Sequence, residues 1–149
     1  MVSQAIPYVM ARVVLDTNVL VAAARSRLGA SFELLSRVGT GQFDIVISVP
    51  LALEYEDALV RHMEASGLNR TDIEDIVDYL CNVAIRQEIF FLWRPALRDP
   101  GDDLVLELAV AAECDAIITH NARDFGGASR FRVRVLSPGM YLKELREAK

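Results

Sequence analysis

The sequence predicts an α/β protein, a three-layer α/β/α sandwich with a central, mostly parallel five-stranded sheet. Short apolar runs rich in β-branched residues alternate with longer stretches of helical periodicity, the pattern of parallel strands joined by crossover helices. The chain has 149 residues, of which 52% are hydrophobic and 25% charged, as expected of one domain with a single core. No internal repeat, low-complexity segment or interdomain linker interrupts the alternation.

The strands are predicted from short apolar runs that end at polar or turn-forming residues. Buried strands of parallel sheets have nearly continuous apolar sequences, and Val13-Val14-Leu15 and Ile45-Val46-Ile47 fit this description. The same criterion selects the later runs Ile89-Phe90-Phe91-Leu92 and Ala116-Ile117-Ile118-Thr119. The predicted strands are residues 12–15, 43–47, 89–92, 116–119 and 132–136.

The helices between these strands are predicted from start and stop signals and from apolar periodicity. Pro50 suits the first turn of a helix, and Gly67 ends it. A stripe of apolar residues with a period of 3.6 marks the next helix, which starts at Thr71-Asp72. The turn signal Asp99-Pro100-Gly101 precedes another strongly helical run. The predicted helices are residues 19–24, 32–38, 48–65, 71–84, 102–113 and 138–146.

Composition and charge limit the class of protein. A net charge of −5 argues against a protein that holds nucleic acid by a broad basic surface, although bound cations can reverse that field locally. Cys81 and Cys114 form no ligand motif, so we expect small core residues or unreactive thiols. No signal peptide or membrane-spanning run occurs, so we expect a cytoplasmic protein. Residues 1–11 are expected to form an N-terminal extension to a domain at residues 12–149.

Asp16 lies where the first predicted strand ends, and Thr17 and Asn18 follow it. Ligands of open α/β sheets bind beyond the carboxyl ends of the strands, so Asp16 is expected at the mouth of a cleft. Asp and Asn are also favoured helix N-caps. A purely capping role for Asp16 or Asn18 is therefore the alternative.

Further acidic and amide side chains occur near the ends of other predicted strands or at the start of a predicted helix. They are Glu54, Asp102, Asp103, Asn121 and Asp124. If the first, second and fourth strands are parallel, several of these side chains converge on one edge of the sheet. Clustered carboxylates repel each other, and a divalent cation relieves that repulsion. Ligand sets made only of oxygen suit Mg²⁺ or Mn²⁺, and such an ion assists hydrolysis of a phosphodiester.

Several polar residues have simpler expected roles. Asp102 is expected mainly to interact with the helix dipole, whereas Asp103 is expected in the site. Asp124 has a capping role as its alternative. The remaining residues of this kind are expected to be solvent-facing or bystanders: Glu56, Asp57, Glu107, His62 and His120.

The order of these motifs resembles the PIN-domain family of metal-dependent ribonucleases, which includes toxin components of bacterial toxin–antitoxin pairs. Val13–Leu20 is similar to the family's opening motif, and Ser48–Tyr55 to the segment that holds its second acidic residue. Asp99–Leu104 resembles the region of the third acidic residue, and Ile117–Phe125 that of the fourth. With a closing strand and helix at Val133–Tyr141, the resemblance extends from about Arg12 to Leu145.

The resemblance implies an endoribonuclease that uses Mg²⁺ or Mn²⁺, with RNA as substrate and an antitoxin protein as possible partner. The fourth motif of the family commonly has Asp where this chain has Asn121, and Asp124 would then supply the missing carboxylate. The resemblance assigns catalytic roles to Asp16, Glu54, Asp103 and Asp124, supporting roles to Thr17, Asn18, Thr119 and Asn121, and metal binding to Asp16, Asp103 and Asp124.

Other classes of protein fit the sequence less well. Haloacid-dehalogenase-like phosphatases and receiver domains also place an Asp after the first strand, but both use a Lys, and the first here is Lys143. No glycine fingerprint of a nucleotide site and no nucleophile elbow occurs. The alternative that remains is a PIN-like module without catalysis that binds RNA or protein, with Asn121 in its support. The apolar content also predicts exposed apolar patches, and hence a homo-oligomer or a bound partner.

Overall fold

A five-stranded parallel sheet forms the centre of the computed structural model, which describes residues 10–89 and 100–148. The strands are β1 (Arg12–Leu15), β2 (Asp44–Ile47), β3 (Ile85–Arg86), β4 (Ala116–Ile118) and β5 (Arg134–Leu136). Their order in the sheet is β3-β2-β1-β4-β5, and every pair of neighbours is parallel. The predicted α/β class with a mostly parallel five-stranded sheet is confirmed.

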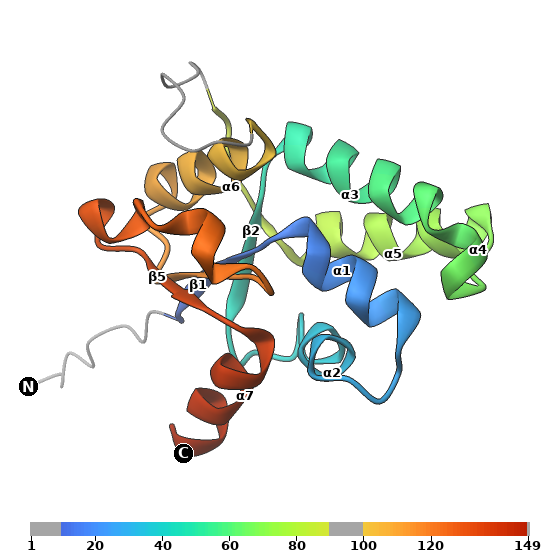
Figure 1. The fold of residues 1–149 in the computed structure, drawn as a ribbon, viewed down its shortest axis with the longest axis horizontal. Helices are drawn as coiled ribbons and strands as arrows, with labels where there is room; N and C mark the ends of the chain where they lie inside the picture. Colours follow the sequence, from blue (N-terminus) through green and yellow to red (C-terminus); the bar gives the residue numbers. More distant parts are fainter. Residues whose placement is uncertain (1–9, 90–99, 149) are drawn as a thin grey trace, which may run out of the picture.

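Helices cover both faces of this sheet. They are α1 (Thr17–Arg25), α2 (Ala30–Ser36), α3 (Val49–Arg61), α4 (Met63–Ser66), α5 (Arg70–Val83), α6 (Pro100–Ala111) and α7 (Pro138–Glu147), with 3₁₀ helices η1 (Ala122–Phe125) and η2 (Ala128–Phe131). Helix α6 packs against β1, β2 and β4, while α2 packs against α1 and α7. Figure 1 shows the strands between α6 on one side and α1 and α2 on the other. Within the described ranges no helix combines the length and apolar character needed to cross a membrane.

Local sequence signals fix the helix ends. The side chains of Ser48 and Ser137 cap α3 and α7 by accepting a hydrogen bond from the backbone N–H three residues further on. Asn69 and Asp72 form a reciprocal capping box at the start of α5. Gly67 ends α4 with a φ of 78°, a left-handed conformation that glycine adopts without steric penalty. The helix predicted at residues 48–65 is divided into α3 and α4 because His62 leaves helical geometry.

The third strand differs from its prediction. Strand β3 follows α5 almost directly and pairs with β2 through Val46 opposite Ile85 and Ile47 opposite Arg86. Ile89 lies outside any strand, so the prediction was wrong there, and residues 90–92 lie outside the described residues. The prediction followed the strongest apolar run. An edge strand has only one neighbour, however, so its position is set by the hydrogen-bonding groups that β2 presents.

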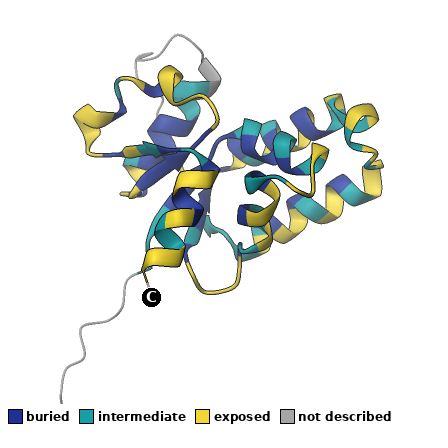
Figure 2. Ribbon diagram, turned by 60° about the horizontal axis from the view of Figure 1, so that its bottom comes forward, coloured by how far each residue is buried: buried dark blue, intermediate teal, exposed yellow. Residues whose placement is uncertain are grey.

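The three inner strands supply the centre of the hydrophobic core. Residues 13–15, 45–47 and 116–118 are each 3% exposed or less, as expected for parallel strands covered on both faces. Figure 2 shows the buried strands at the centre and the exposed residues on the outer faces of the helices. Phe43 and Tyr141 pack edge to face with their ring centroids 5.5 Å apart, which joins the start of β2 to α7. Cys114 is buried and Cys81 half-buried, and both are free thiols as predicted.

Glu107 on α6 is a correction to the sequence analysis. It was expected to face solvent, but only 4% of the residue is exposed. Helix α6 contacts three strands and also packs against α3 and η1. A helix covered on so many sides has a narrower solvent-facing stripe than a surface helix with one buried face.

Replacing Leu106 by Ala is expected to lower the free energy of unfolding by about 2–5 kcal/mol. Leu106 is fully buried on α6, so the substitution leaves a cavity against the sheet. Urea or thermal unfolding measures the change. Leu28→Ala is the matched control, because Leu28 is 99% exposed and its loss should shift stability by no more than about 0.5 kcal/mol. Equal losses in the two variants would contradict the packing of α6 described above.

Candidate active site

The candidate active site lies at the carboxyl ends of β1 and β4. From β1 the chain proceeds to β2 and β3 on one side of the sheet, and then returns to β4 and β5 on the other. The strand order therefore reverses between β1 and β4, and open α/β sheets bind ligands at such a switch point. Asp16 follows β1 directly and Thr119 follows β4, so the two residues flank this point.

Asp16 is buried and hydrogen-bonded through both carboxylate oxygens. Only 8% of the residue is exposed. Its Oδ1 accepts a hydrogen bond of 2.8 Å from the backbone N–H of Thr17, and its Oδ2 accepts one of 2.7 Å from the hydroxyl of Thr119. The first bond makes Asp16 the N-cap of α1. The capping role and the position at the sheet edge, posed above as alternatives, therefore occur together.

Thr119 connects the polar residues that follow β1 and β4. While its hydroxyl donates to Asp16, its Oγ1 accepts hydrogen bonds from Asn18 Nδ2 at 3.3 Å and from the backbone N–H of Asn121 at 3.0 Å. Asn18 Oδ1 in turn accepts from the backbone N–H of His120 at 3.2 Å. The predicted supporting residues Asn18, Thr119 and Asn121 thus belong to one network around Asp16.

Thr17 takes part in this network through its backbone only. Its N–H binds Asp16, but its buried Oγ1 has no hydrogen-bond partner among the described residues. The expected orientation of a carboxylate by Thr17 is therefore a backbone contact. Any residue except proline would supply the same N–H.

Tyr55 links α3 to the end of β1. Tyr55 is 1% exposed, and its hydroxyl donates a hydrogen bond of 2.5 Å to the backbone carbonyl of Leu15, the residue before Asp16. Burial raises the pKa of Tyr55 well above its usual value of 10.0, and the negative charges of Asp16 and Glu54 raise that pKa further. The two carboxylates therefore lie close enough to Tyr55 to act on it electrostatically. Glu54 is half-buried whereas Glu56 and Asp57 are exposed, as predicted.

Asp102 and Asp103 lie in the first turn of α6, and both are half-buried. Helix α6 packs against β1 and β4, and also against α3 and η1, which carry Glu54 and Asp124. The elements that hold the predicted carboxylates are therefore neighbours.

Asn121 and Asp124 are exposed and line one polar hollow of about 670 Å³. The backbone N–H of Asp124 donates to the carbonyl of Asn121 at 2.9 Å, in the turn that opens η1. The remaining lining comes from His120, Ala122 and Arg123. The fourth motif therefore presents its amide, its carboxylate and one cation to the same space.

The chemistry and placement of the predicted ligands limit how the site could hold an ion. All the predicted ligands carry oxygen, which suits Mg²⁺ or Mn²⁺. Across residues 10–89 and 100–148, however, no three acidic, His or Cys side chains form a group that could hold an ion together. Mg²⁺ is commonly held by one or two carboxylates, with water completing its coordination. The residues fit Mg²⁺ or Mn²⁺ in that manner, and not as a closed cage of three carboxylates.

Comparison with known families matches residues 12–123 to a PIN domain. This chain belongs to the PIN-domain family. PIN domains are generally nucleases, and the match includes Asp16, Glu54, Asp103 and Thr119, whereas Asp124 lies one residue beyond it. A comparison with curated protein sequences finds no match.

A solved structure with the same fold is the crystal structure of VapBC2 from Rickettsia felis bound to a DNA fragment from their promoter. The similarity has a TM-score of 0.53 and covers 85% of this chain and 97% of that chain. The sequences are 13% identical, so this similarity establishes the PIN fold and not a shared substrate.

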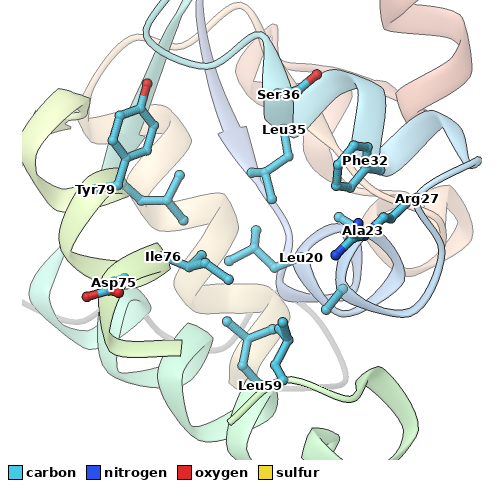
Figure 3. Close-up of a pocket in the computed structure, with 13 residues that line it drawn as sticks. Leu20, Ala23, Arg27, Phe32, Leu35, Ser36, Leu59, Asp75, Ile76 and Tyr79 are labelled. Carbon is cyan, nitrogen blue, oxygen red and sulfur yellow. The ribbon is translucent and has the colours of Figure 1, made fainter. Parts of the chain in front are cut away.

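A second hollow, on the helical side, is apolar. It measures about 390 Å³ and is lined from α1, α2 and α5 by residues that include Leu20, Phe32 and Ile76 (Figure 3). Arg27 and Asp75 are its charged residues. None of the predicted site residues lines it. Hydrolysis of a phosphodiester needs polar groups at the reacting atoms, so the sheet edge is the better candidate for the active site.

Sequence reasoning missed two features of this site. The hydroxyl of Tyr55 contacts the backbone of β1, whereas the sequence motif indicates no such role for Tyr55. His120, expected to be a bystander, lies with its Nε2 2.6 Å from the hydroxyl oxygen of the buried Ser31. No local sequence pattern predicts either contact. The partners are 40 residues apart for Tyr55 and Leu15, and 89 residues apart for His120 and Ser31.

Tyr55→Phe is expected to cost about 1 kcal/mol of stability at neutral pH and to flatten the loss of stability at alkaline pH. The folded chain keeps Tyr55 protonated at pH values where the unfolded chain has released that proton. The contribution of Tyr55 to the free energy of unfolding of the wild type is therefore fully present below about pH 10. It falls as the pH rises above that value.

Urea unfolding of both proteins at about pH 8 and about pH 11 checks this expectation. The wild type should lose up to about 1.4 kcal/mol per pH unit more than Tyr55→Phe. Parallel pH profiles would contradict the burial of a protonated phenol beside Asp16 and Glu54.

Proposed function

We propose that this chain is a metal-dependent endoribonuclease that hydrolyses RNA phosphodiester bonds, and that it acts as the toxin of a toxin–antitoxin pair. One observation carries the proposal. The buried carboxylate of Asp16 is held by Thr119 at the switch point of a PIN-family sheet. A charge buried at the ligand-binding edge is costly for folding alone, and its position suits binding of a cation.

In this proposal the metal is held by one or two of the carboxylates of Asp16, Asp103 and Asp124 with water completing its coordination, and Glu54 is the fourth catalytic carboxylate. Bound Mg²⁺ or Mn²⁺ would supply a Lewis acid and a water molecule with a lowered pKa. Each oxygen of Asp16 accepts a hydrogen bond, one from Thr17 and one from Thr119, and a carboxylate oxygen has two lone pairs. Asp16 can therefore meet a cation while Thr17 and Thr119 keep it in place.

The neighbouring polar residues would position this carboxylate. Partners that hydrogen-bond a metal ligand fix its orientation, and their loss typically weakens metal binding or activity about 10–100-fold. Thr119 has this role toward Asp16, and Asn18 holds Thr119 in turn. Asn121 offers an amide oxygen without charge, so Asp124 in the same hollow would add the missing negative charge.

The alternative function is a PIN-like module that binds RNA or protein without cleaving it. Asn121 favours it, because the neutral amide leaves the site with less charge for a cation. The dispersed carboxylates are also compatible with weak metal binding. The two functions differ in one result, since only the nuclease releases shortened RNA in the presence of Mn²⁺.

Asp16→Asn is expected to lower RNA cleavage more than about 100-fold while the protein stays folded. Asn has nearly the same volume and caps helices as well as Asp, so the melting temperature should change by no more than about 5 °C. The measurement is cleavage of single-stranded and structured RNA with Mn²⁺, with Mg²⁺ and with EDTA.

Asp57→Asn is the matched control. It makes the same chemical change on the exposed surface of α3, where Asp57 pairs with Arg61. Its activity should equal that of the wild type. Full activity of a cleanly purified Asp16→Asn protein would rule out the mechanism. Calorimetric titration of Asp124→Ala with Mn²⁺ then tests the metal role of Asp124, and unchanged affinity would remove it from the ligand set.

The toxin role is supported by the fold shared with VapBC2, and it implies an antitoxin as partner. Large apolar side chains exposed on several helices and in the turn before α2 offer surface for such a partner, and for the homo-oligomer expected from composition. They include Leu28, Phe32, Val49, Leu53 and Met140.

Induced expression of the wild-type chain in a bacterial host is expected to arrest growth, because an active endoribonuclease removes RNA needed for translation. Expression of Asp16→Asn to the same level should leave growth unchanged. Coexpression of the product of an adjacent small gene should restore growth to the wild-type strain. Equal growth of the two strains would contradict the toxin role and leave the nuclease proposal to the cleavage assay.

A further inference from the structure

Ser31 and His120 form a hydrogen-bonded pair beside the candidate active site. Ser31 lies in the first turn of α2 and is only 3% exposed, whereas His120 is exposed. The Ser31 Oγ and the His120 Nε2 are 2.6 Å apart. A buried hydroxyl thus restrains the ring of an exposed histidine.

The backbone of His120 is restrained as well. Its N–H donates to Asn18 Oδ1, and Asn18 also donates to Thr119, which binds Asp16. His120 is therefore fixed at both its ring and its backbone, relative to the Asp16 carboxylate. Its second ring nitrogen, Nδ1, makes no hydrogen bond with the described residues.

This second nitrogen has the chemistry of a phosphate ligand. If the Ser31 hydroxyl donates to Nε2, the neutral imidazole carries its proton on Nδ1 and can donate it to an anionic oxygen. His120 and Arg123 line the same polar hollow as Asn121 and Asp124. The chain has a net charge of −5, so it repels a polyanionic substrate such as RNA. Hydrogen-bond donors close to the carboxylates of the candidate site offset that repulsion where the substrate would bind.

We propose that His120 binds a phosphate of the RNA backbone through Nδ1 next to the position of cleavage, and that Ser31 is the positioning residue that sets its tautomer and orientation. This inference rests on the proposed nuclease function. Arg123 supplies a second donor from η1 in the same hollow. The contact requires no covalent step, and it stabilises bound substrate.

Three substitutions at His120 test the contact atom. An Asn side chain places an amide N–H near the position of Nδ1, and a Gln side chain places one near Nε2. His120→Ala and His120→Gln should each raise the KM for a single-stranded RNA about tenfold, whereas His120→Asn should stay within about threefold of wild type. The kcat and the calorimetric affinity for Mn²⁺ should change little in all three. His62→Ala is the control, because it removes the chain's other histidine, which lies at the junction of α3 and α4 and does not line the hollow.

Ser31→Ala tests the positioning role. It should raise the KM by several-fold alone and have no further effect in a His120→Ala background, because the hydroxyl acts only through the ring. Additive effects of the two substitutions would overturn this role. An unchanged KM in His120→Ala, or rescue by Gln and not by Asn, would overturn the Nδ1 contact. If instead the wild type neither cleaves nor binds RNA, the nuclease proposal itself has failed.

Discussion

Burial of the Asp16 charge is the constraint on which the rest of the site depends. An ionised carboxylate that is 8% exposed is tolerated only if other groups replace its hydration. The hydroxyl of Thr119, the N–H of Thr17 and the N-terminus of α1 do so. The first of these groups requires β4 to lie beside β1 in parallel register, and the second requires α1 to begin directly after the strand. Stabilising the Asp16 carboxylate therefore requires both the order of β1 and β4 in the sheet and the start of α1 directly after β1.

The parts of the fold that could be predicted from sequence are those set by residues close together along the chain. The apolar run before Asp16 marks a buried strand, and the signals around Ser48 and Gly67 mark helix ends, because each depends on residues a few positions apart. The position of β3 could not be predicted in this way. It depends on which groups β2 leaves unpaired, and a stronger apolar run a few residues later competes for the same role.

The same distinction applies to the candidate site, where some residues could be recognised from local sequence and the contacts between distant segments could not. Asp16 and Glu54 could be selected as candidates because acidic residues at or soon after strand ends are a local pattern, and their roles remain predictions. The contacts that hold the site could not. The Thr119 hydroxyl meets Asp16 only through the register of β1 against β4, and Glu107 is buried only because α3 and η1 cover α6.

The separation along the chain between Asp16 and Thr119 has a consequence for synthesis. Their hydrogen bond joins positions 103 residues apart, so it contributes to a high contact order and forms only after β4 is available to pair. A chain still on the ribosome, or one cut short before β4, holds Asp16 without the hydroxyl that fixes it. The arrangement therefore postpones assembly of the polar network around Asp16 until the chain has been made as far as β4.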